Sequence, residues 1–316
     1  MRKFNLKGKV AQKLKGVVME AETGDGAPIP VTGDGEPSPV AAESLRTTWR
    51  TDTGRLRRNN QDAVIAAEGL YGVADGMGGH NGGEIASGEL RDGLVREISG
   101  KEPEMETLRL AVEKVNLELW ERQEHDAALT GMGTTLTAIW PSEREMIIAH
   151  VGDSRAYLFR KGEMTQVTSD HSMVADMVRR GILTEEQAAC HPMRNYITRA
   201  VGTEDTIEVD MLCFPREAGD RWLICSDGLH GMTTKTELKR LGQIENPEEA
   251  ADRLLQAALD GGGRDNISLV ILDDAVGAAE KAEETQEAGE TEETDAQSQT
   301  PDQAILPTDQ EGGADA

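Results

Sequence analysis

The sequence predicts an α+β domain in which two antiparallel β-sheets form a central sandwich flanked by helices, an α-β-β-α arrangement. Three observations predict it. Short apolar runs end repeatedly in turns rich in glycine and aspartate. Two connections between such runs contain only three or four residues, too few for the crossover that parallel neighbours need. Long helical segments separate the groups of strands, so helices can cover the outer faces of the sheets.

Six segments are predicted strands because β-branched and apolar residues dominate them and turn residues end them. They are residues 69–74, 134–140, 145–151, 155–160, 221–225 and 266–273. The short connections at 141–144 and 152–154 predict that the second, third and fourth of these strands are antiparallel neighbours.

Six segments are predicted helices, namely residues 83–98, 103–125, 171–180, 184–189, 235–241 and 247–260. The second carries an apolar stripe at helical spacing, which predicts a face packed on the core. The stripe consists of Met105, Leu108, Val112, Val115 and Leu119.

The predicted domain spans residues 45–275, enough for one well-buried core. Residues 1–44 combine a basic segment with a Gly/Pro-rich linker, and residues 276–316 hold 12 acidic residues and one lysine. Both ends are predicted to be disordered, because they cannot bury enough apolar surface to offset the cost of ordering. Residues 1–19 are basic, and their apolar residues Leu6, Val10, Leu14, Val17 and Val18 recur at helical spacing, which leaves an amphipathic helix that contacts a membrane or an acidic partner as the less favoured alternative.

The overall charge excludes some functions. Fifty-eight acidic residues against 33 basic ones give a formal net charge of −25, which argues against nucleic-acid binding because that requires a basic surface. No apolar run approaches the roughly 20 residues of a membrane span, and the basic start lacks the apolar stretch of a secretory signal. Three cysteines are too few for a disulfide framework, so a cytoplasmic monomer with reduced thiols is expected.

Aspartates beside turn residues mark the ends of several predicted strands. Five are candidates for one site: Asp62, Asp75, Asp153, Asp227 and Asp265. Asp-Gly pairs are ordinary in turns, so five unrelated surface turns are the alternative. If the strand ends converge, the carboxylates repel one another unless cations lie between them. Oxygen ligands without a His or Cys cluster suit Mg²⁺ or Mn²⁺ rather than Zn²⁺.

The order of the motifs resembles the bacterial branch of the metal-dependent (type 2C, PPM-type) serine/threonine protein phosphatases, over about residues 47–272. The family's fold is the same helix-flanked sandwich. The motifs are Gly54-x-x-Arg57-x-x-Asn60-Gln61-Asp62, Val73-Ala74-Asp75-Gly76-Met77-Gly78-Gly79-His80, Gly133-Thr134-Thr135, Ala149-His150-Val151-Gly152-Asp153-Ser154-Arg155, Thr168-Ser169-Asp170-His171-Ser172, Ile197-Thr198-Arg199-Ala200-Val201-Gly202, Cys225-Ser226-Asp227-Gly228-Leu229 and Gly263-Arg264-Asp265-Asn266.

This resemblance implies a two-ion site. Asp75 resembles the carboxylate that bridges two Mn²⁺ or Mg²⁺ ions, with the carbonyl of Gly76 on the second ion. Asp227 and Asp265 resemble the remaining ligands of the first ion. Asp62 resembles the residue that holds metal-bound waters.

Three further roles follow from the resemblance. Asp153, together with Asp227, resembles the pair that holds a third, looser ion in bacterial members. Arg57 resembles the arginine that grips the substrate phosphate, a task that suits a guanidinium fork. Asn266 is expected to orient Asp265 or a metal-bound water.

The implied activity is hydrolysis of phosphoserine and phosphothreonine by direct attack of a metal-bridging hydroxide, without a phosphoenzyme. The implied substrates are phosphorylated proteins, in opposition to a bacterial serine/threonine kinase. Two alternatives remain open at this point. One is a non-catalytic phosphoprotein-binding module, which the presence of every metal-position aspartate disfavours. The other is a phosphohydrolase with a small-molecule substrate or a stress-response anti-sigma partner.

Two positions depart from the family pattern. Met77 occupies the position of a histidine that is the proposed general acid in the eukaryotic branch, which leaves protonation of the leaving group to water. His80 is expected to be structural rather than a replacement acid. Gln61 stands where many relatives carry Glu, so water contacts of the second ion are expected to be weaker.

Residues 172–196 resemble the family's flap beside the site, and a substrate-touching role is the expectation for it. His171 opens this segment and is predicted to follow a helix-capping Asp170. The remaining histidines are predicted to be structural; they are His125, His150, His191 and His230.

Overall fold

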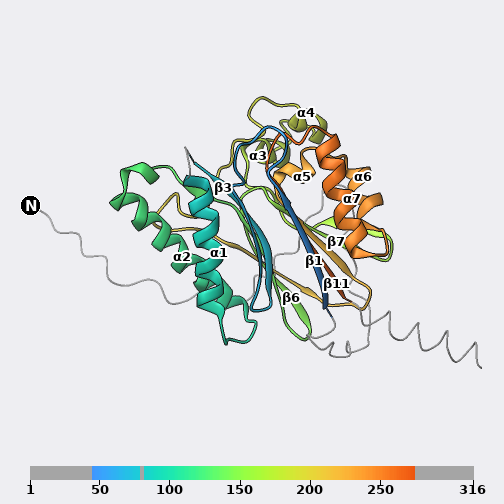
Figure 1. Ribbon diagram of the computed structural model, residues 1–316, viewed down its shortest axis with the longest axis horizontal. Coiled ribbons are helices and arrows are strands. Elements are labelled where there is room, and N and C mark those ends of the chain that lie inside the picture. The colour runs from blue at the N-terminus through green and yellow to red at the C-terminus, as the bar shows by residue number, and fades with distance from the viewer. Residues whose placement is uncertain (1–44, 79–81, 275–316) are drawn as a thin grey trace, which may run out of the picture. The chain divides into compact units, whose positions relative to one another are not determined.

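The computed structural model describes residues 45–78 and 82–274 (Figure 1). The predictions made for residues 1–44 and 276–316, and for His80, lie outside these residues. The boundaries of the predicted domain therefore stay a prediction.

The first sheet has five strands in the order β1-β11-β10-β7-β8. They are β1 (Leu45–Asp52), β11 (Ile267–Asp274), β10 (Arg221–Cys225), β7 (Arg155–Arg160) and β8 (Glu163–Gln166). The second sheet runs β2-β3-β5-β6-β9, and a short strand β4 also pairs with β3. Its strands are β2 (Asp62–Ala67), β3 (Leu70–Met77), β4 (Gly133–Thr134), β5 (Leu136–Pro141), β6 (Glu145–Val151) and β9 (Asp210–Pro215). Every pairing in both sheets is antiparallel, as predicted.

Helices cover both outer faces of the sandwich (Figure 1). α1 (Gly82–Ile98) and α2 (Met105–His125) pack on the second sheet, where Leu90, Leu94 and Leu108 belong to one buried cluster with strand residues. α5 (Asp227–His230), α6 (Lys235–Gly242) and α7 (Pro247–Asp260) cover the first sheet.

A third cluster fills the space between the sheets, with Trp222 and Ile224 from one and Val73 and Ile148 from the other. Three apolar layers therefore hold four layers of structure together, and the predicted α-β-β-α architecture is confirmed.

The pairing of β6 and β7 differs from the prediction. They were expected to be antiparallel neighbours because only residues 152–154 join them, but β6 pairs with β5 and β9 while β7 pairs with β10 and β8. The connection instead carries the chain from one sheet to the other. Gly152 allows this with a φ of +106°, a conformation that side chains rarely adopt, and a Cβ there would lie 2.6 Å from the Thr135 side chain.

The six predicted helices are all present within a few residues of their predicted bounds, with two corrections, whereas the short α5 was not predicted. Met105, the first residue of α2, is exposed, although the rest of the predicted stripe is buried. α3 (Met173–Arg179) begins two residues later than predicted, and its cap is the Ser172 hydroxyl, which accepts from Ala175 N. Asp170, the predicted cap, binds Arg155 instead.

The predicted flap contains α3 and α4 (Glu185–Ala189). α4 starts with a reciprocal pair of bonds between Thr184 and Gln187, which satisfies two backbone N–H groups at its first turn. The ends of the flap meet at an isolated bridge between Ser172 and Ile197. The flap is therefore closed at its base by backbone pairing.

Candidate active site

The five candidate aspartates lie at one end of the sandwich. In an antiparallel pair the start of one strand faces the end of its neighbour, and Asp62 and Asp75 are direct partners at the start of β2 and the end of β3. Asp227 follows the end of β10, and Asp265 precedes the start of β11. Asp153 stands in the connection between the two sheets. We call these five residues the carboxylate site.

Hydrogen bonds join the two sheets at this end. The Ser226 hydroxyl, at the end of β10, donates to Asp62 Oδ2 on β2 at 2.8 Å. The Asn266 side-chain Oδ1 accepts the Gln61 backbone N–H at 2.9 Å. The ends of the sheets are thus fixed relative to one another by contacts made inside the site.

Two glycines permit close backbone approach around the aspartates. A Cβ on Gly76 would lie 2.0 Å from the Gly83 carbonyl oxygen and 2.5 Å from that of Gln61. A Cβ on Gly228 would lie 1.9 Å from the carbonyl oxygen of Asn266. Since no side chain fits at either position, the Asp-Gly pairs at residues 75–76 and 227–228 are required by packing and are not merely turn signals.

The backbone of Asp75 is held from the next strand. Thr135 Oγ1 accepts the Asp75 N–H at 3.0 Å, and the Asp75 carbonyl accepts both the Thr135 N–H at 2.9 Å and the Thr134 hydroxyl at 3.0 Å. Thr135 Oγ1 also lies 2.8 Å from Ser154 Oγ, beside Asp153. One threonine therefore connects the positions of two candidate ligands.

Three carboxylate oxygens in the site are buried without a hydrogen-bond partner among the described residues. They are Oδ1 of Asp62, Oδ1 of Asp153 and Oδ1 of Asp227. An unpaired buried carboxylate oxygen is costly unless a cation is present. The donor set therefore fits hard divalent cations, which bind oxygen ligands.

The carboxylates also perturb one another. Burial raises the pKa of Asp62 to about 7, with smaller increases from the charges of Asp227 and Asp265 and an opposing decrease from hydrogen bonds donated by serine hydroxyls. Burial and then repulsion by Asp227 raise the pKa of Asp153 to about 8, and burial and then Asp265 raise that of Asp227 to about 6. Burial and then Asp62 raise the pKa of Asp75 well above its ordinary value. A site with this much uncompensated negative charge is suited to cations.

Across residues 45–78 and 82–274, no three carboxylate, imidazole or thiolate groups already converge on one point. The arrangement of these side chains therefore defines no ion position, and the assignment of the five aspartates as metal ligands stays a prediction. Several of the carboxylates instead point to partners within the protein, as Asp62 does to Ser226.

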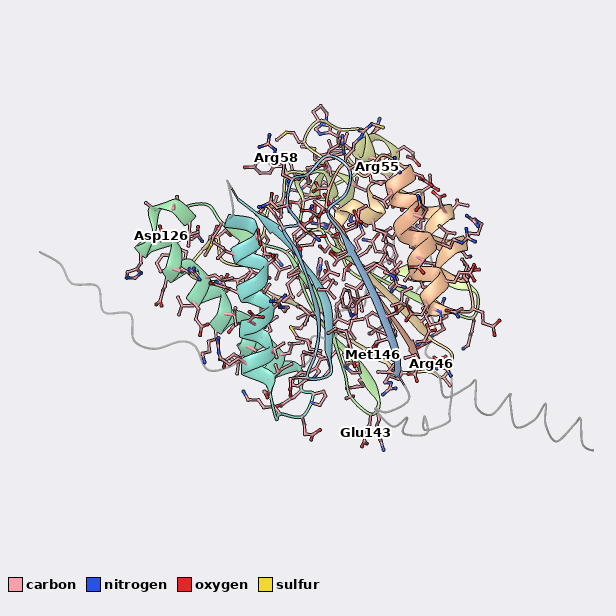
Figure 2. All side chains as sticks on the ribbon, in the orientation of Figure 1. Arg46, Arg55, Arg58, Asp126, Glu143 and Met146 are labelled. Atoms are coloured by element: carbon pink, nitrogen blue, oxygen red, sulfur yellow. The ribbon has the colours of Figure 1, made fainter. Side chains whose placement is uncertain are left out.

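Arg57 lies beside the carboxylate site on the loop between β1 and β2. Its Nη2 donates to Asp265 Oδ2 at 2.7 Å, and its side chain is 46% exposed. The neighbouring Arg55 and Arg58, labelled in Figure 2, mark the same end of the molecule, whereas Arg46 and Glu143 mark the opposite end. The predicted phosphate-binding arginine is thus next to a predicted metal ligand.

Asn266 makes contacts beyond its expected role. It was expected to orient Asp265 or a water, and its backbone N–H does donate to Asp265 Oδ1 at 2.8 Å. Its side-chain amide, however, donates to the carbonyl oxygens of Thr53 and Asn59 and accepts from Gln61 N. The side chain therefore holds the loop that carries Arg57.

The positions that depart from the family pattern both border the site. Met77 ends β3 opposite Gly133. Gln61 is buried, and its carbonyl oxygen accepts from Gly76 N at 3.1 Å and from the Ser87 hydroxyl at 2.6 Å. Gln61 thereby connects the start of β2 to the segment after Asp75 and to α1.

Sequence reasoning assigned no role to Ser226, Thr135 or Ser154, which position the aspartates. The available signal was their place inside the quoted motifs, each within a few residues of a candidate ligand. Their hydroxyl contacts cross between sequence segments far apart, so no local pattern indicates them.

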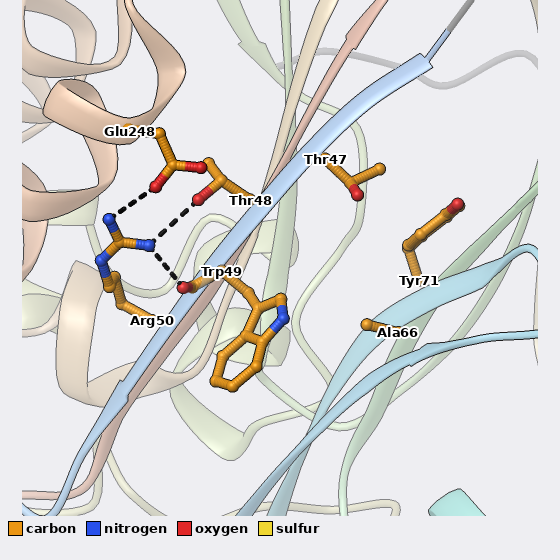
Figure 3. A pocket seen from close by; sticks show the side chains of 7 residues that line it. All are labelled: Thr47, Thr48, Trp49, Arg50, Ala66, Tyr71 and Glu248. Carbon is orange, nitrogen blue, oxygen red and sulfur yellow. Dashed lines mark hydrogen bonds and ion pairs between the residues drawn. The ribbon is translucent and has the colours of Figure 1, made fainter. Parts of the chain in front are cut away.

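A separate hollow of about 520 Å³ is lined by residues of β1, β2, β3 and α7 (Figure 3). Trp49 and Tyr71 line it, and none of the five aspartates does. Its charged groups are already paired, since Arg50 donates to Glu248 at 2.7 Å and to the Thr48 hydroxyl at 3.0 Å. This hollow therefore has no group placed for catalysis.

Two global features concern the described part of the chain. No helix within it is both long and apolar enough to cross a membrane. The three cysteines are unpaired, with Cys190 and Cys213 exposed and Cys225 buried.

A helix-flanked sandwich with buried carboxylates at one end, suited to binding cations, is the arrangement of a metal-dependent phosphatase. The family model described as protein phosphatase 2C matches residues 51–262, more than half of the chain. The chain belongs to the protein phosphatase 2C family, which confirms the resemblance seen in its motifs.

Two curated relatives are similar over the same region. Serine/threonine protein phosphatase PstP of Mycobacterium tuberculosis is 40% identical over 232 residues, covering 72% of this chain and 45% of that protein. Serine/threonine phosphatase stp of Listeria monocytogenes is 37% identical over 243 residues, covering 72% of this chain and 96% of that protein. The match thus spans less than half of the mycobacterial protein and nearly all of the Listeria one.

A solved structure agrees with the fold. The catalytic domain of PstP in complex with two manganese ions matches with a TM-score of 0.68 and 39% identity, covering 72% of this chain and 97% of that one. The similarity places the predicted sandwich in a family of known bacterial serine/threonine phosphatases.

Proposed function

We propose that this chain is a metal-dependent protein phosphatase that hydrolyses phosphoserine and phosphothreonine. The observation that carries the proposal is the end of the sandwich, where buried oxygens of Asp62, Asp153 and Asp227 have no partner among the described residues and Arg57 stands beside them. The similarity to named serine/threonine phosphatases supports the class of substrate.

The aspartates would hold two Mn²⁺ or Mg²⁺ ions. Asp75 would contribute to both, Gly76 would add its carbonyl, Asp227 and Asp265 would complete the first set, and Asp62 would hold coordinated water. When bound, a pair of divalent ions supplies a water-derived nucleophile near neutral pH and neutralises charge on the phosphate. The solved PstP domain, which is in complex with two manganese ions, supports a site for two ions.

A third, weaker ion is part of the proposal. Asp153 would hold it together with Asp227. The orphaned Oδ1 atoms of both residues support this assignment. So does the repulsion from Asp227, which adds to burial in raising the pKa of Asp153.

Arg57 would bind the phosphate of the substrate. Its guanidinium carries several N–H donors, of which one is directed at Asp265 in the described structure, and nearly half of the side chain is exposed. The bond to Asp265 orients the guanidinium toward the aspartates that would hold the ions. Substrate oxygens would accept from the remaining donors and so become aligned with the nucleophile.

Residue 77 cannot donate a proton to the leaving group. Met77 has no titratable proton, so we assign protonation of the departing serine or threonine oxygen to water within the site. The buried His150 and His230 do not substitute, because burial lowers their pKa to about 4 and about 3 and both rings bond to backbone carbonyls.

The proposed setting is the cytoplasm, as a monomer that opposes a bacterial serine/threonine kinase. The unpaired cysteines and the names of the bacterial relatives support this setting. Its substrates would be phosphorylated proteins and not nucleic acid, in keeping with the net charge of −25. Membrane contact through the basic residues near the start of the chain remains the less favoured alternative.

The decisive experiment measures phosphate release from a phosphothreonine peptide with Mn²⁺, with Mg²⁺ and with chelator. Turnover that requires the ion supports the proposal. Turnover that persists in chelator contradicts the metal mechanism, and peptide binding without turnover under any ion indicates a binding module.

A further inference from the structure

His171 lies at a junction between the flap and the connection that carries Asp153. It is buried, and it is bonded to Gly152 twice: its N–H donates to the Gly152 carbonyl at 2.7 Å, and its ring Nδ1 accepts the Gly152 N–H at 3.0 Å. Gly152 is the residue immediately before Asp153. Both polar atoms of that residue's backbone are therefore fixed by one histidine.

The same residue is bonded to the other end of the flap. Its carbonyl oxygen accepts the Thr198 N–H at 2.9 Å, and the next residue, Ser172, forms the bridge to Ile197. The Met173 N–H also donates to the Tyr196 carbonyl at 2.9 Å. His171 thus stands where both ends of the flap meet the connection between the sheets.

The imidazole is oriented from its far side. Because Nδ1 accepts from Gly152, the ring proton is on Nε2 and is directed at Asp210 Oδ2, 3.1 Å away, while Arg199 Nη1 lies 3.1 Å from the same nitrogen. Arg199 donates to the other oxygen of Asp210 at 2.7 Å. Burial acts to raise the pKa of Asp210, but hydrogen bonds from His171 and Arg199 lower it to about 2, so this carboxylate is ionised at neutral pH.

The backbone carbonyl of Asp153 has a hydrogen-bond partner, whereas its side-chain Oδ1 has none among the described residues. His230 Nε2 lies 3.0 Å from the Asp153 carbonyl, and the following Ser154 bonds to Thr135 and Thr137. The direction of Asp153 Oδ1 therefore depends on the peptide that precedes it, which His171 holds.

We propose that His171 is a positioning residue that sets Asp153 for its ion and links this ion to the flap. The inference rests on the proposed function, because it takes Asp153 as a ligand of the third ion. A flap displaced at its base moves His171 and, through Gly152, turns Asp153. By the same connection, filling the ion site stabilises the base of the flap.

The two ring nitrogens can be tested separately. The side-chain oxygen of asparagine reaches the position of Nδ1, and the side-chain nitrogen of glutamine reaches that of Nε2. His171→Asn therefore keeps the acceptor for Gly152, whereas His171→Gln keeps the donor to Asp210 and loses that acceptor. His150→Gln is the matched control, since the ring of this neighbouring buried histidine lies 4.9 Å from the His171 ring, tilted by 36°, but its nitrogens contact Thr137 and Ser169 and not Gly152.

The measurement is Mn²⁺ binding by calorimetry on the full chain, with Asp153→Ala as the reference for loss of the weaker ion. We expect His171→Gln to weaken the Asp153-dependent binding by about tenfold, the range for residues that orient a ligand. His171→Asn and His150→Gln should stay within about twofold of the unmutated chain, and the two tighter binding events should be retained throughout.

Several results would overturn the inference. One is His171→Gln binding the weaker ion as tightly as the unmutated chain while Asp153→Ala does not. Equal losses in the Gln and Asn variants would show that only packing matters. If Asp153→Ala changes no binding event, the third ion and this inference both fail, whereas Mn²⁺-dependent turnover would still support the two-ion phosphatase.

Amide hydrogen exchange on the unmutated chain provides a test that does not depend on a variant folding. Raising Mn²⁺ from occupancy of the tight sites to occupancy of the weak site should slow exchange at the N–H groups of Gly152 and Thr198 together. Asp153→Ala should abolish this change. Unaltered exchange at both positions in the unmutated chain would refute the link.

Discussion

Arg57 donates a hydrogen bond from Nη2 to Oδ2 of Asp265 at 2.7 Å, so the predicted phosphate-binding group and a predicted metal ligand are in direct contact. The pair is partly exposed, and such a pair alone adds little stability. Its consequence is geometric, because it fixes the guanidinium beside the carboxylates.

Replacing Arg57 by alanine should impair substrate binding far more than folding. Charge-assisted hydrogen bonds are worth about 1.5–3 kcal/mol, so kcat/KM should fall about 10- to 100-fold, mainly through KM. Steady-state kinetics on a phosphothreonine peptide tests this. Arg55→Ala is the control on the same loop, since Arg55 only pairs weakly with Asp260 at 3.4 Å. Equal effects of the two substitutions would contradict phosphate binding by Arg57.

Asp75→Asn should abolish turnover without unfolding the chain. Burial and then repulsion by Asp62 and Asp227 raise the pKa of Asp75, so the isosteric amide removes a charge that the metal-free fold tolerates poorly. In chelator, Tm should equal or exceed that of the unmutated chain. Added Mn²⁺ should raise Tm in the unmutated chain and much less in the variant. Retained turnover, or an undiminished Mn²⁺ effect on Tm, would rule out a ligand role.

The fully buried pair of Arg216 and Asp274 should be important for stability at the end opposite the site. Arg216 Nε donates to Asp274 at 2.9 Å, and both side chains are completely buried. Asp274→Asn leaves a buried charge uncompensated and should cost about 3–5 kcal/mol in the free energy of unfolding. Urea denaturation measures it. The exposed pair of Lys239 and Glu163 is the comparison, where Glu163→Gln should cost less than about 1 kcal/mol.

His150 should contribute to acid sensitivity. Burial and then His171 lower its pKa from 6.5 to about 4, against the smaller opposing effects of Asp170 and Asp210. A histidine with a depressed folded-state pKa leaves stability complete above the unfolded value, and stability falls as pH drops below about 6.5 toward 4. The limit of this contribution is roughly 3 kcal/mol. His150→Gln should remove it.

Urea midpoints of the two proteins should therefore differ in their dependence on pH over that range, with the steeper loss in the unmutated chain. Chelator in every sample keeps metal binding from changing with pH. Parallel curves for the two proteins would show that His150 does not titrate as inferred.

A chain cut to residues 45–275 should retain turnover and its dependence on Mn²⁺. All five candidate aspartates and Arg57 lie inside this range. Peptide kinetics on the shortened and full chains, measured side by side, test the predicted domain. Loss of activity from a folded shortened chain would show that one of the removed segments contributes to the site.

The strongly apolar strands and long helices could be predicted from sequence because their patterns are local. β6, β7 and β10 were predicted with their observed bounds. β1 was missed because Thr47, Trp49 and Thr51 are exposed at a sheet edge, so it has no apolar face to recognise. β8 and β9 were missed because one has four residues and the other is only partly buried.

The aspartates of the carboxylate site could be predicted from the sequence, but the residues and the connection that hold them in place could not. An aspartate at a strand end can be recognised from the turn residues next to it in the sequence, and antiparallel pairing brings those strand ends together. The partner sheet of β7 depended on the direction of one turn at Gly152, which spacing cannot specify. The side-chain partners of Asn266 could not be predicted for a similar reason, since Thr53, Asn59 and Gln61 come from a distant part of the sequence.

The connection at residues 152–154 has a mechanical consequence. Asp62 and Asp75 lie on strands of one sheet, Asp227 and Asp265 lie just outside the ends of strands β10 and β11 of the other, and Asp153 lies in the segment that passes between the sheets. An ion held by aspartates from both sheets would resist any sliding of one sheet over the other. Metal occupancy would then be measurable far from the chemistry, as the force or the denaturant needed to shear the two halves of the sandwich apart.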